Sequence, residues 1–324
     1  MEIFNPHSNI HFLRLRKFTI VIAICLIVTA LALTFTRGLN YGLDFTGGVV
    51  VELQYQQQSV DIADVRAALD KGGFPLAVVQ PLGGTHDVSV RLQPKNDPKA
   101  LSTVNGKVKV NVDKIASDVL KALTAAGEKV TISSRDFVGP EVGASLRTKG
   151  IYATVFVIIF IMLYLWMRFE RRFAIAAVLT EIHDAVVVVG VYALTQHTFD
   201  LTVLASLMAV VGYSVNDKVV VFDRVRELFR LARKADAEEI LNRSINSTLS
   251  RTILTASLTF ISMLALFLVG GPVVRGFAET MMIGIAIGTL SSIFIACPIL
   301  LWLGVSKKDL MPKRRDEAEL SRRP

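Results

Sequence analysis

The chain has 324 residues, of which 52% are hydrophobic, and its mean hydropathy is +0.49. These values are typical of an integral membrane protein and exclude a large soluble domain. The formal net charge of +8 could suggest nucleic acid, but the Lys and Arg residues cluster beside apolar runs, where they set membrane orientation. We therefore expect no nucleic-acid partner.

The two cysteines, Cys25 and Cys297, both fall within apolar runs. They are too few for a disulfide framework or a cysteine-based metal cluster. We expect neither a cofactor nor a metal.

The first apolar run, residues 18–36, follows a basic segment, residues 1–17, and is long enough to cross a bilayer. A cleaved signal peptide is the alternative, because Arg14, Arg16 and Lys17 precede the run and it contains small residues at 30–32. The run is longer than a signal core, however, and the small residues lie inside it. An uncleaved first span with a cytoplasmic amino terminus is favoured.

Residues 37–149 have the character of a soluble domain. Strands are predicted at 49–55, 76–80, 86–92 and 129–137. Ser59 is expected to cap one helix, and a second follows Asp113 and stops at Gly127. The resulting order, βαββαβ, is the ferredoxin-like α+β pattern. The fold class is therefore a helical membrane protein with this domain inserted between spans one and two.

An insertion, residues 94–112, separates the third strand from the second helix of this domain. Its Asn105-Gly106 pair is flanked by residues with strand propensity. Asn-Gly between two such segments is a strong signal for a two-residue hairpin turn, so we expect a small β-hairpin here.

Five further apolar runs bring the number of expected spans to six. They are residues 151–167, 173–195, 201–222, 252–269 and 280–303. Basic residues gather between spans two and three, between four and five, and in the tail 304–324, whereas the opposite loops contain only Arg275. This asymmetry predicts that both termini are cytoplasmic and that the soluble domain is periplasmic.

The segment 223–250 is basic and amphipathic, with Val225, Leu228 and Phe229 on one face. We expect it to lie as an interfacial helix on the cytoplasmic leaflet of the bilayer. A solvated connector between the spans is the alternative.

Span three contains Glu181, His183 and Asp184. Glu181 and Asp184, at i and i+3, share one face of a helix. The triplet resembles a metal site, but adjacent helical residues point in different directions and no second His or Cys cluster completes a ligand set. We therefore treat the three as secondary candidates for proton transfer.

Span four carries Asn216 and Asp217, with apolar residues still following them. At about 1.5 Å per residue, Asp217 lies roughly 10 Å inside the hydrocarbon edge. Ionisable groups at that depth are costly and usually functional, so Asp217 is the leading candidate site and Asn216 a secondary one. The alternative is a carboxylate retained only for helix packing.

Span five opens with Arg251, which the same counting places at a level similar to Asp217. A carboxylate paired with arginine stays charged, whereas a desolvated, unpaired one takes up a proton. An Asp217 that alternates between these environments would carry a proton across the membrane. A permanent ion pair, or an Arg251 that reaches to the lipid headgroups, are the alternatives.

Span six contains Gly284 and Gly288. A GxxxG pair lets two membrane helices approach closely. We expect these glycines to serve helix packing.

Several motifs, in this order, carry a resemblance to a known family. They are GLDFTGG at 42–48, FVGP at 137–140, His183-Asp184, LASL at 204–207, GYSVND at 212–217, DRVRE at 223–227, Arg251-Thr252 and GGP at 270–272. The chain resembles the SecD/SecF family of bacterial protein-export membrane proteins, relatives of the resistance-nodulation-division transporters. Lys218 and Glu181 depart from the family pattern, which favours a small polar and an apolar residue there.

The resemblance implies a transport subunit of the inner membrane rather than an enzyme. Its expected partners are a SecD-like subunit, the SecYEG channel, an unfolded exported polypeptide and the lipid bilayer. The expected role is to use the proton-motive force to draw exported polypeptide outward, with Asp217 and Arg251 in the proton pathway.

Two other classes remain open from the residues alone. A half-size exporter of small molecules or lipids would also carry protons on Asp217, but such exporters usually have two six-span repeats. A structural adaptor without a transport cycle would use Asp217 for packing only.

Overall fold

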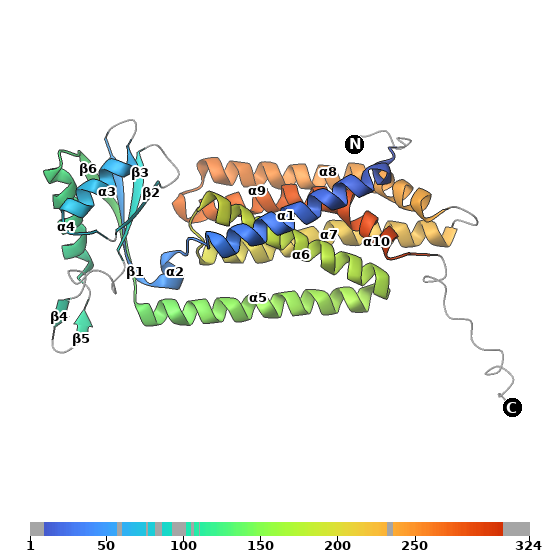
Figure 1. The fold of residues 1–324 in the computed structure, drawn as a ribbon, viewed down its shortest axis with the longest axis horizontal. Coiled ribbons are helices and arrows are strands. Elements are labelled where there is room, and N and C mark those ends of the chain that lie inside the picture. The colour runs from blue at the N-terminus through green and yellow to red at the C-terminus, as the bar shows by residue number, and fades with distance from the viewer. Residues whose placement is uncertain are drawn as a thin grey trace, which may run out of the picture.

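The computed structural model describes residues 10–56, 60–75, 77–81, 86–92, 102–104, 107–109, 111–231 and 236–306. An α+β domain lies at one end of the molecule and a bundle of long helices forms the remainder (Figure 1). The predicted basic tail lies outside the described residues beyond position 306.

The α+β domain contains a four-stranded antiparallel sheet. Its strands are β1 (Gly48–Tyr55), β2 (Val78–Pro81), β3 (Asp87–Leu92) and β6 (Val130–Val138), in the order β2-β3-β1-β6. Helices α3 (Ile62–Lys71) and α4 (Val112–Ala125) complete the βαββαβ order, and the predicted ferredoxin-like fold is confirmed.

The two helices cover one face of this sheet and form its core with the inward side chains of the strands (Figure 1). Val49, Val51 and Leu53 alternate along β1 and are no more than 1% exposed, as expected for a strand with one face on a core. Val65 on α3 and Val119 on α4 reach the same core. The sheet therefore buries one face, and β6, with exposed side chains along much of its length, lies at its edge.

Two predicted details of this domain have clear outcomes. Strands β4 (Ser102–Val104) and β5 (Lys107–Lys109) pair antiparallel, so the hairpin expected around Asn105-Gly106 is confirmed. Ser59 lies outside the described residues, and the cap of α3 is instead Asp61, whose side chain accepts a hydrogen bond from the amide of Ala63 at 2.8 Å.

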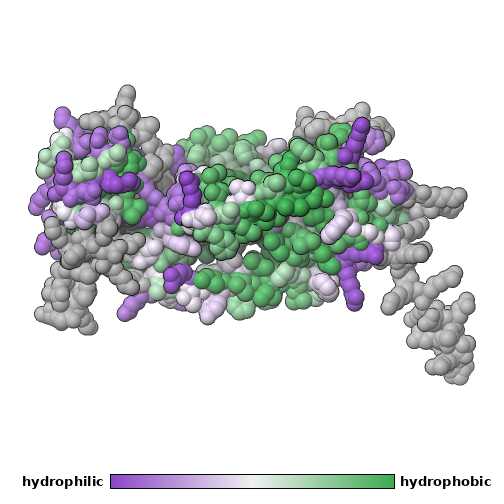
Figure 2. Space-filling model, viewed as in Figure 1, coloured by the Kyte–Doolittle hydropathy of each residue, from purple (hydrophilic) through white to green (hydrophobic). Residues whose placement is uncertain are grey.

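Among the described residues, six helices of the bundle are long and apolar enough to cross a membrane, as predicted. They are α1 (Arg16–Thr36), α5 (Pro140–Arg168), α6 (Arg171–Thr195), α7 (Leu201–Leu231), α8 (Ala237–Val269), and α9 (Pro272–Ser291), which a π-helical turn, η3 (Ser292–Ala296), joins to α10 (Cys297–Trp302). On the face of the molecule seen in Figure 2, hydrophobic residues cover the middle of the bundle and hydrophilic residues lie toward both of its ends.

Three of the spans are central and three are peripheral. In α6, α7 and the span formed by α9 and α10, 56% of the residues in the most apolar 18-residue stretch are buried, against 11% in α1, α5 and α8. The peripheral helices therefore expose apolar side chains, which a bilayer or a membrane partner would cover.

The single interfacial helix expected over residues 223–250 is not formed. Residues 223–231 complete α7, and residues 237–250 are the first turns of α8. Val225 and Phe229 are buried in a cluster that includes Ile240 and Ile245 of α8. The apolar face of this segment is thus covered by protein, which amphipathicity alone does not distinguish from lipid.

Gly284 and Gly288 lie where α9 meets α7. A Cβ added at Gly288 would stand 2.7 Å from Ser214 Oγ, and one at Gly284 would overlap the side chain of Val210. By contrast, nothing lies within 4 Å of the Cβ position of Gly212 on α7.

We expect Gly288→Ala to destabilise the purified chain by about 1–3 kcal/mol, because overpacking forces α9 away from α7. Gly212→Ala is the matched control and should be neutral or stabilising by up to about 1 kcal/mol, since alanine favours helix. Thermal unfolding in detergent measures both variants. A Gly288→Ala protein as stable as Gly212→Ala would contradict this close contact.

Candidate functional site

A lysine is the centre of the polar cluster inside the bundle. The side chain of Lys218 on α7 is completely buried. Its Nζ donates to Glu181 Oε2 at 2.5 Å, to Asp184 Oδ2 at 2.8 Å and to Ser214 Oγ at 2.7 Å. An ammonium donates three hydrogen bonds at most, so Lys218 uses its full capacity on three oxygens.

Asp184 is the second centre of the cluster and is 1% exposed. Its Oδ2 also accepts hydrogen bonds from Ser214 Oγ at 2.7 Å and from Ser291 Oγ at 2.6 Å. Its Oδ1 lies 2.9 Å from His183 Nδ1. Four side chains from three spans therefore converge on this one carboxylate.

Helical periodicity and close packing explain why these residues meet. Glu181 and Asp184 are three residues apart on α6, and Ser214 and Lys218 are four apart on α7, so each pair shares a helix face. Gly288 allows α9 to approach Ser214, and Ser291 stands one turn further along α9. We call Glu181, His183, Asp184, Ser214, Lys218 and Ser291 the buried charge cluster.

Asp217 stands beside this cluster without joining its hydrogen bonds. It is 3% exposed, and its Oδ2 has no hydrogen-bond partner among the described residues. Successive helical residues diverge by about 100°, so Asp217 and Lys218 leave α7 in different directions. Asn216, the preceding residue, is exposed.

The predicted neighbour of Asp217, Arg251, is exposed on α8. The two side chains interact electrostatically, but no ion pair within 4.0 Å joins them in the described part of the chain. The structure thus brings Glu181, His183 and Asp184 together and keeps Asp217 and Arg251 apart. In the described residues, no group of three His, Cys, Asp or Glu side chains has a metal-binding arrangement.

Lys218, Ser214 and Ser291 belong to this site although none of them was among the predicted site residues. A signal was present, because Lys218 is a basic residue within an apolar span and Glu181 is an acidic residue within the preceding one. Opposite charges in adjacent membrane spans usually pair.

A second polar site joins the α+β domain to the bundle. Segment 38–42 follows α1, and its amide at Gly42 donates to the carbonyl of Phe199, while the amide of Phe199 donates to the carbonyl of Asn40. Phe45 on α2 (Leu43–Thr46) stacks on Phe199 with ring centroids 6.2 Å apart. The connection is therefore ordered by backbone pairing and by aromatic contacts.

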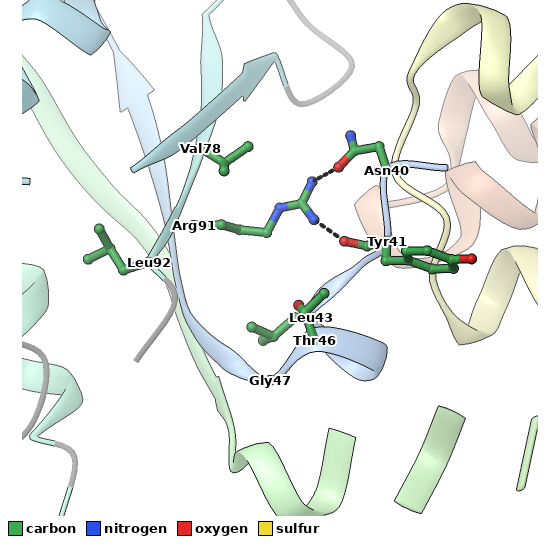
Figure 3. Close-up of a pocket in the computed structure, with 8 residues that line it drawn as sticks. All are labelled: Asn40, Tyr41, Leu43, Thr46, Gly47, Val78, Arg91 and Leu92. Carbon is green, nitrogen blue, oxygen red and sulfur yellow. Dashed lines mark hydrogen bonds between the residues drawn. The ribbon is translucent and has the colours of Figure 1, made fainter. Parts of the chain in front are cut away.

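Arg91 reaches this connection from β3 (Figure 3). Its guanidinium donates to the carbonyl of Tyr41 at 2.7 Å, to Thr198 Oγ1 at 3.0 Å and to the side chains of Asn40 and Gln80. Burial lowers the pKa of Arg91, yet an arginine remains charged at physiological pH. A buried cation with several hydrogen bonds thus fastens the domain to both the 38–42 segment and the 196–200 loop.

Arg91→Ala should loosen the α+β domain from the bundle, because it leaves several buried acceptors without a donor. Spin labels at Asp70→Cys and Leu194→Cys, in a Cys25→Ser background, would report the distance distribution between the two parts. We expect a clear broadening for Arg91→Ala and none for Arg66→Ala, which alters an exposed arginine of the same domain. An unchanged distribution would show that Arg91 does not fasten the domain.

The GLDFTGG motif has a backbone role next to this site. Gly47 and Gly48 have φ values of 67° and 129°, in the region that favours glycine. A Cβ added at Gly143 would lie 2.9 Å from the amide nitrogen of Gly47, so α5 begins in close contact with this turn. The paired glycines therefore let the chain turn from α2 into the central strand β1.

The six-span bundle, its buried charges and the inserted ferredoxin-like domain define a membrane transport protein of the kind that carries charged residues within its spans. Residues 118–306 match the family "Protein export membrane protein SecD/SecF, C-terminal", and residues 32–59 match the "SecD/SecF GG Motif". The chain belongs to the SecD/SecF family and is a multi-pass membrane protein.

Curated relatives match over nearly their full length. The protein translocase subunit SecF of Pseudomonas aeruginosa is 43% identical over 94% of this chain and 95% of its own length. The subunit of the same name from Vibrio alginolyticus is 38% identical over 100% of this chain and 99% of its own.

Two solved structures share the fold. The crystal structure of SecDF from Thermus, described as a translocon-associated membrane protein, is 32% identical with a TM-score of 0.79. SecDF in a super-membrane-facing form is also 32% identical, with a TM-score of 0.65. The matches cover 93% and 100% of this chain, but only 39% and 41% of the longer SecDF chains.

Proposed function

We propose that this chain is the SecF-type subunit of a Sec protein-export machinery and that it works with a SecD-like subunit beside the SecYEG channel. Its nearly full-length similarity to SecF subunits supports this role. The longer SecDF chains contain additional sequence beyond the region that matches this chain, which is consistent with a separate SecD-like partner here. The exposed apolar faces of α1, α5 and α8 are suitable surfaces for such a partner.

The observation that carries the energetic part of the proposal is the position of Asp217. This carboxyl group is buried in an apolar span, and one of its oxygens has no hydrogen-bond partner in the described part of the structure. We propose that Asp217 binds and releases a proton as its distance from Arg251 changes, and that this cycle couples the proton-motive force to movement of exported polypeptide. In this proposal, the arrangement in which no ion pair joins the two side chains corresponds to the unpaired state of that cycle.

Complementation tests the proposed function. Cells depleted of both their own SecD-type and SecF-type subunits should regain export of a secreted protein when this chain and its SecD-like partner are supplied together. Either subunit alone should fail, and an uncoupler that collapses the proton gradient should abolish the gain. A gain that persists without the partner or without the gradient would contradict the proposal.

The basic residues of the bundle support a definite orientation, with both termini in the cytoplasm and the α+β domain in the periplasm. In intact spheroplasts, with Cys25→Ser as background, an impermeant thiol reagent should label Asp70→Cys in the α+β domain. It should label Arg230→Cys, at the carboxyl-terminal end of α7, only after the membrane is permeabilised. Both positions are exposed, so the reverse pattern would mean that the orientation is inverted.

A further inference from the structure

The buried charge cluster carries more negative than positive charge when its groups are in their ordinary ionised states. Lys218 contributes one positive charge, while Glu181 and Asp184 contribute two negative charges, and a neutral His183 adds none. All four residues are buried, with exposed fractions of 0%, 6%, 1% and 4%. Burying one uncompensated charge is so costly that a group usually neutralises instead, so this site is short of one proton.

Hydrogen bonding identifies the group that takes up this proton. Asp184 is in contact with four possible donors, namely His183, Lys218, Ser214 and Ser291, and such bonding favours the charged carboxylate. Glu181 accepts a hydrogen bond only from Lys218 in the described structure, and its Oε1 is buried without a partner. Glu181 is therefore the carboxyl group whose charged form is less stabilised.

His183 is a poorer site for the proton. Its Nδ1 faces Asp184 Oδ1 at 2.9 Å, and a neutral ring that carries its hydrogen on Nδ1 can make this bond. Its Nε2 is buried without a partner among the described residues. A second hydrogen on Nε2 would therefore be an unpaired charged donor in an apolar site, which costs more than an unpaired neutral nitrogen.

We propose that the buried charge cluster is a proton-binding site distinct from Asp217, and that it holds one proton on the Glu181 carboxyl group. The protonated form leaves Lys218 and Asp184 as a neutral ion pair that joins α6 to α7. Loss of the proton adds a negative charge at the meeting point of α6, α7 and α9. The site deepens the proposed function by giving this subunit a second protonatable group, but proton binding by Glu181 does not itself require export.

The charged groups on the neighbouring helices do not neutralise the excess negative charge of the cluster. Asp217 on α7 is a carboxyl group and supplies no positive charge, and the Arg251 side chain on α8 is exposed. The contact from α9 is the hydroxyl of Ser291. The other ionisable residues of the packed helices α1, α5 and α9 in the described chain are not among the hydrogen-bond or ion-pair partners of the cluster; they are Arg16, Lys17, Cys25, Glu141, Arg147, Lys149, Tyr152, Tyr164, Arg168, Arg275 and Glu279.

Infrared spectroscopy of the purified full chain tests the proposal directly. Asp217→Asn serves as the background, so that Asp217 contributes no carboxylic-acid signal. At neutral pH we expect a C=O stretching band of a protonated carboxyl group, which shifts when only glutamate is labelled with carbon-13. Adding Glu181→Gln, which keeps the shape and can still accept from Lys218, should remove that band.

The matched control is Glu239→Gln, which changes an exposed glutamate of α8 and should leave the band intact. Circular dichroism and thermal unfolding check that Glu181→Gln is folded, and Glu181→Asp, which retains a carboxyl group, should restore a band insensitive to glutamate labelling. A band that survives Glu181→Gln, or its absence from the Asp217→Asn protein at neutral pH, would overturn the assignment. Because no export is measured, failure here is distinguishable from failure of the proposed function.

Discussion

Asp217→Asn is expected to abolish the part of export that depends on the proton gradient while the subunit remains inserted and bound to its partner. Asparagine has the shape of aspartate but cannot bind and release a proton. Each charge that crosses the full potential supplies about 2.3 kcal/mol per 100 mV, which is enough to drive a domain rearrangement of a few kcal/mol. Export into membrane vesicles, with and without an imposed gradient, and copurification of the partner measure the two properties.

The matched control for this substitution is Asp70→Asn, which changes an exposed aspartate of the α+β domain. It should retain gradient-dependent export at the wild-type level. Arg251→Met should resemble Asp217→Asn, since it removes the cation that favours release of the proton. Normal gradient-dependent export by both Asp217→Asn and Arg251→Met would show that this relay is wrong, and the buried charge cluster would then be the remaining candidate.

Lys218→Met is expected to destabilise the bundle by about 3–5 kcal/mol, because it leaves Asp184 as a buried charge without its cation. Lys218 is wholly buried, and Asp184 Oδ2 lies 2.8 Å from its Nζ. Thermal or denaturant unfolding of the purified chain in detergent measures the loss. The structure predicts that this lysine is one of the most sensitive positions of α7.

A second substitution distinguishes the lost ion pair from lost volume. Lys218→Met combined with Asp184→Asn removes both charges and should recover much of the stability lost in the single variant. Lys121→Met, which changes an exposed lysine with a side chain 79% accessible, should have little effect. If Lys218→Met is as stable as Lys121→Met, the buried ion pair does not contribute to the bundle as described.

The helical spans and the ferredoxin-like domain could be predicted because their signals are local. Six apolar runs of sufficient length predict six spans wherever the helices pack. The alternation along 86–92 and the Asn-Gly pair at 105–106 report on strands and turns within a few residues of themselves. The predicted helix ends were less accurate. The amino-terminal cap of α3 is Asp61 rather than the predicted Ser59.

The buried charge cluster was decided by tertiary structure. Periodicity placed Glu181 and Asp184 on one face of a helix, but only the packing of α6 against α7 places Lys218 opposite them. Likewise, the amphipathic segment 223–250 has an apolar face that suits lipid or protein equally, and the contact between α7 and α8 selects protein. Which residues must avoid water follows from the individual side chains, because hydrophobicity is a property of each of them. Which charges meet inside the membrane depended on distances between helices, and these arise only when the whole bundle packs.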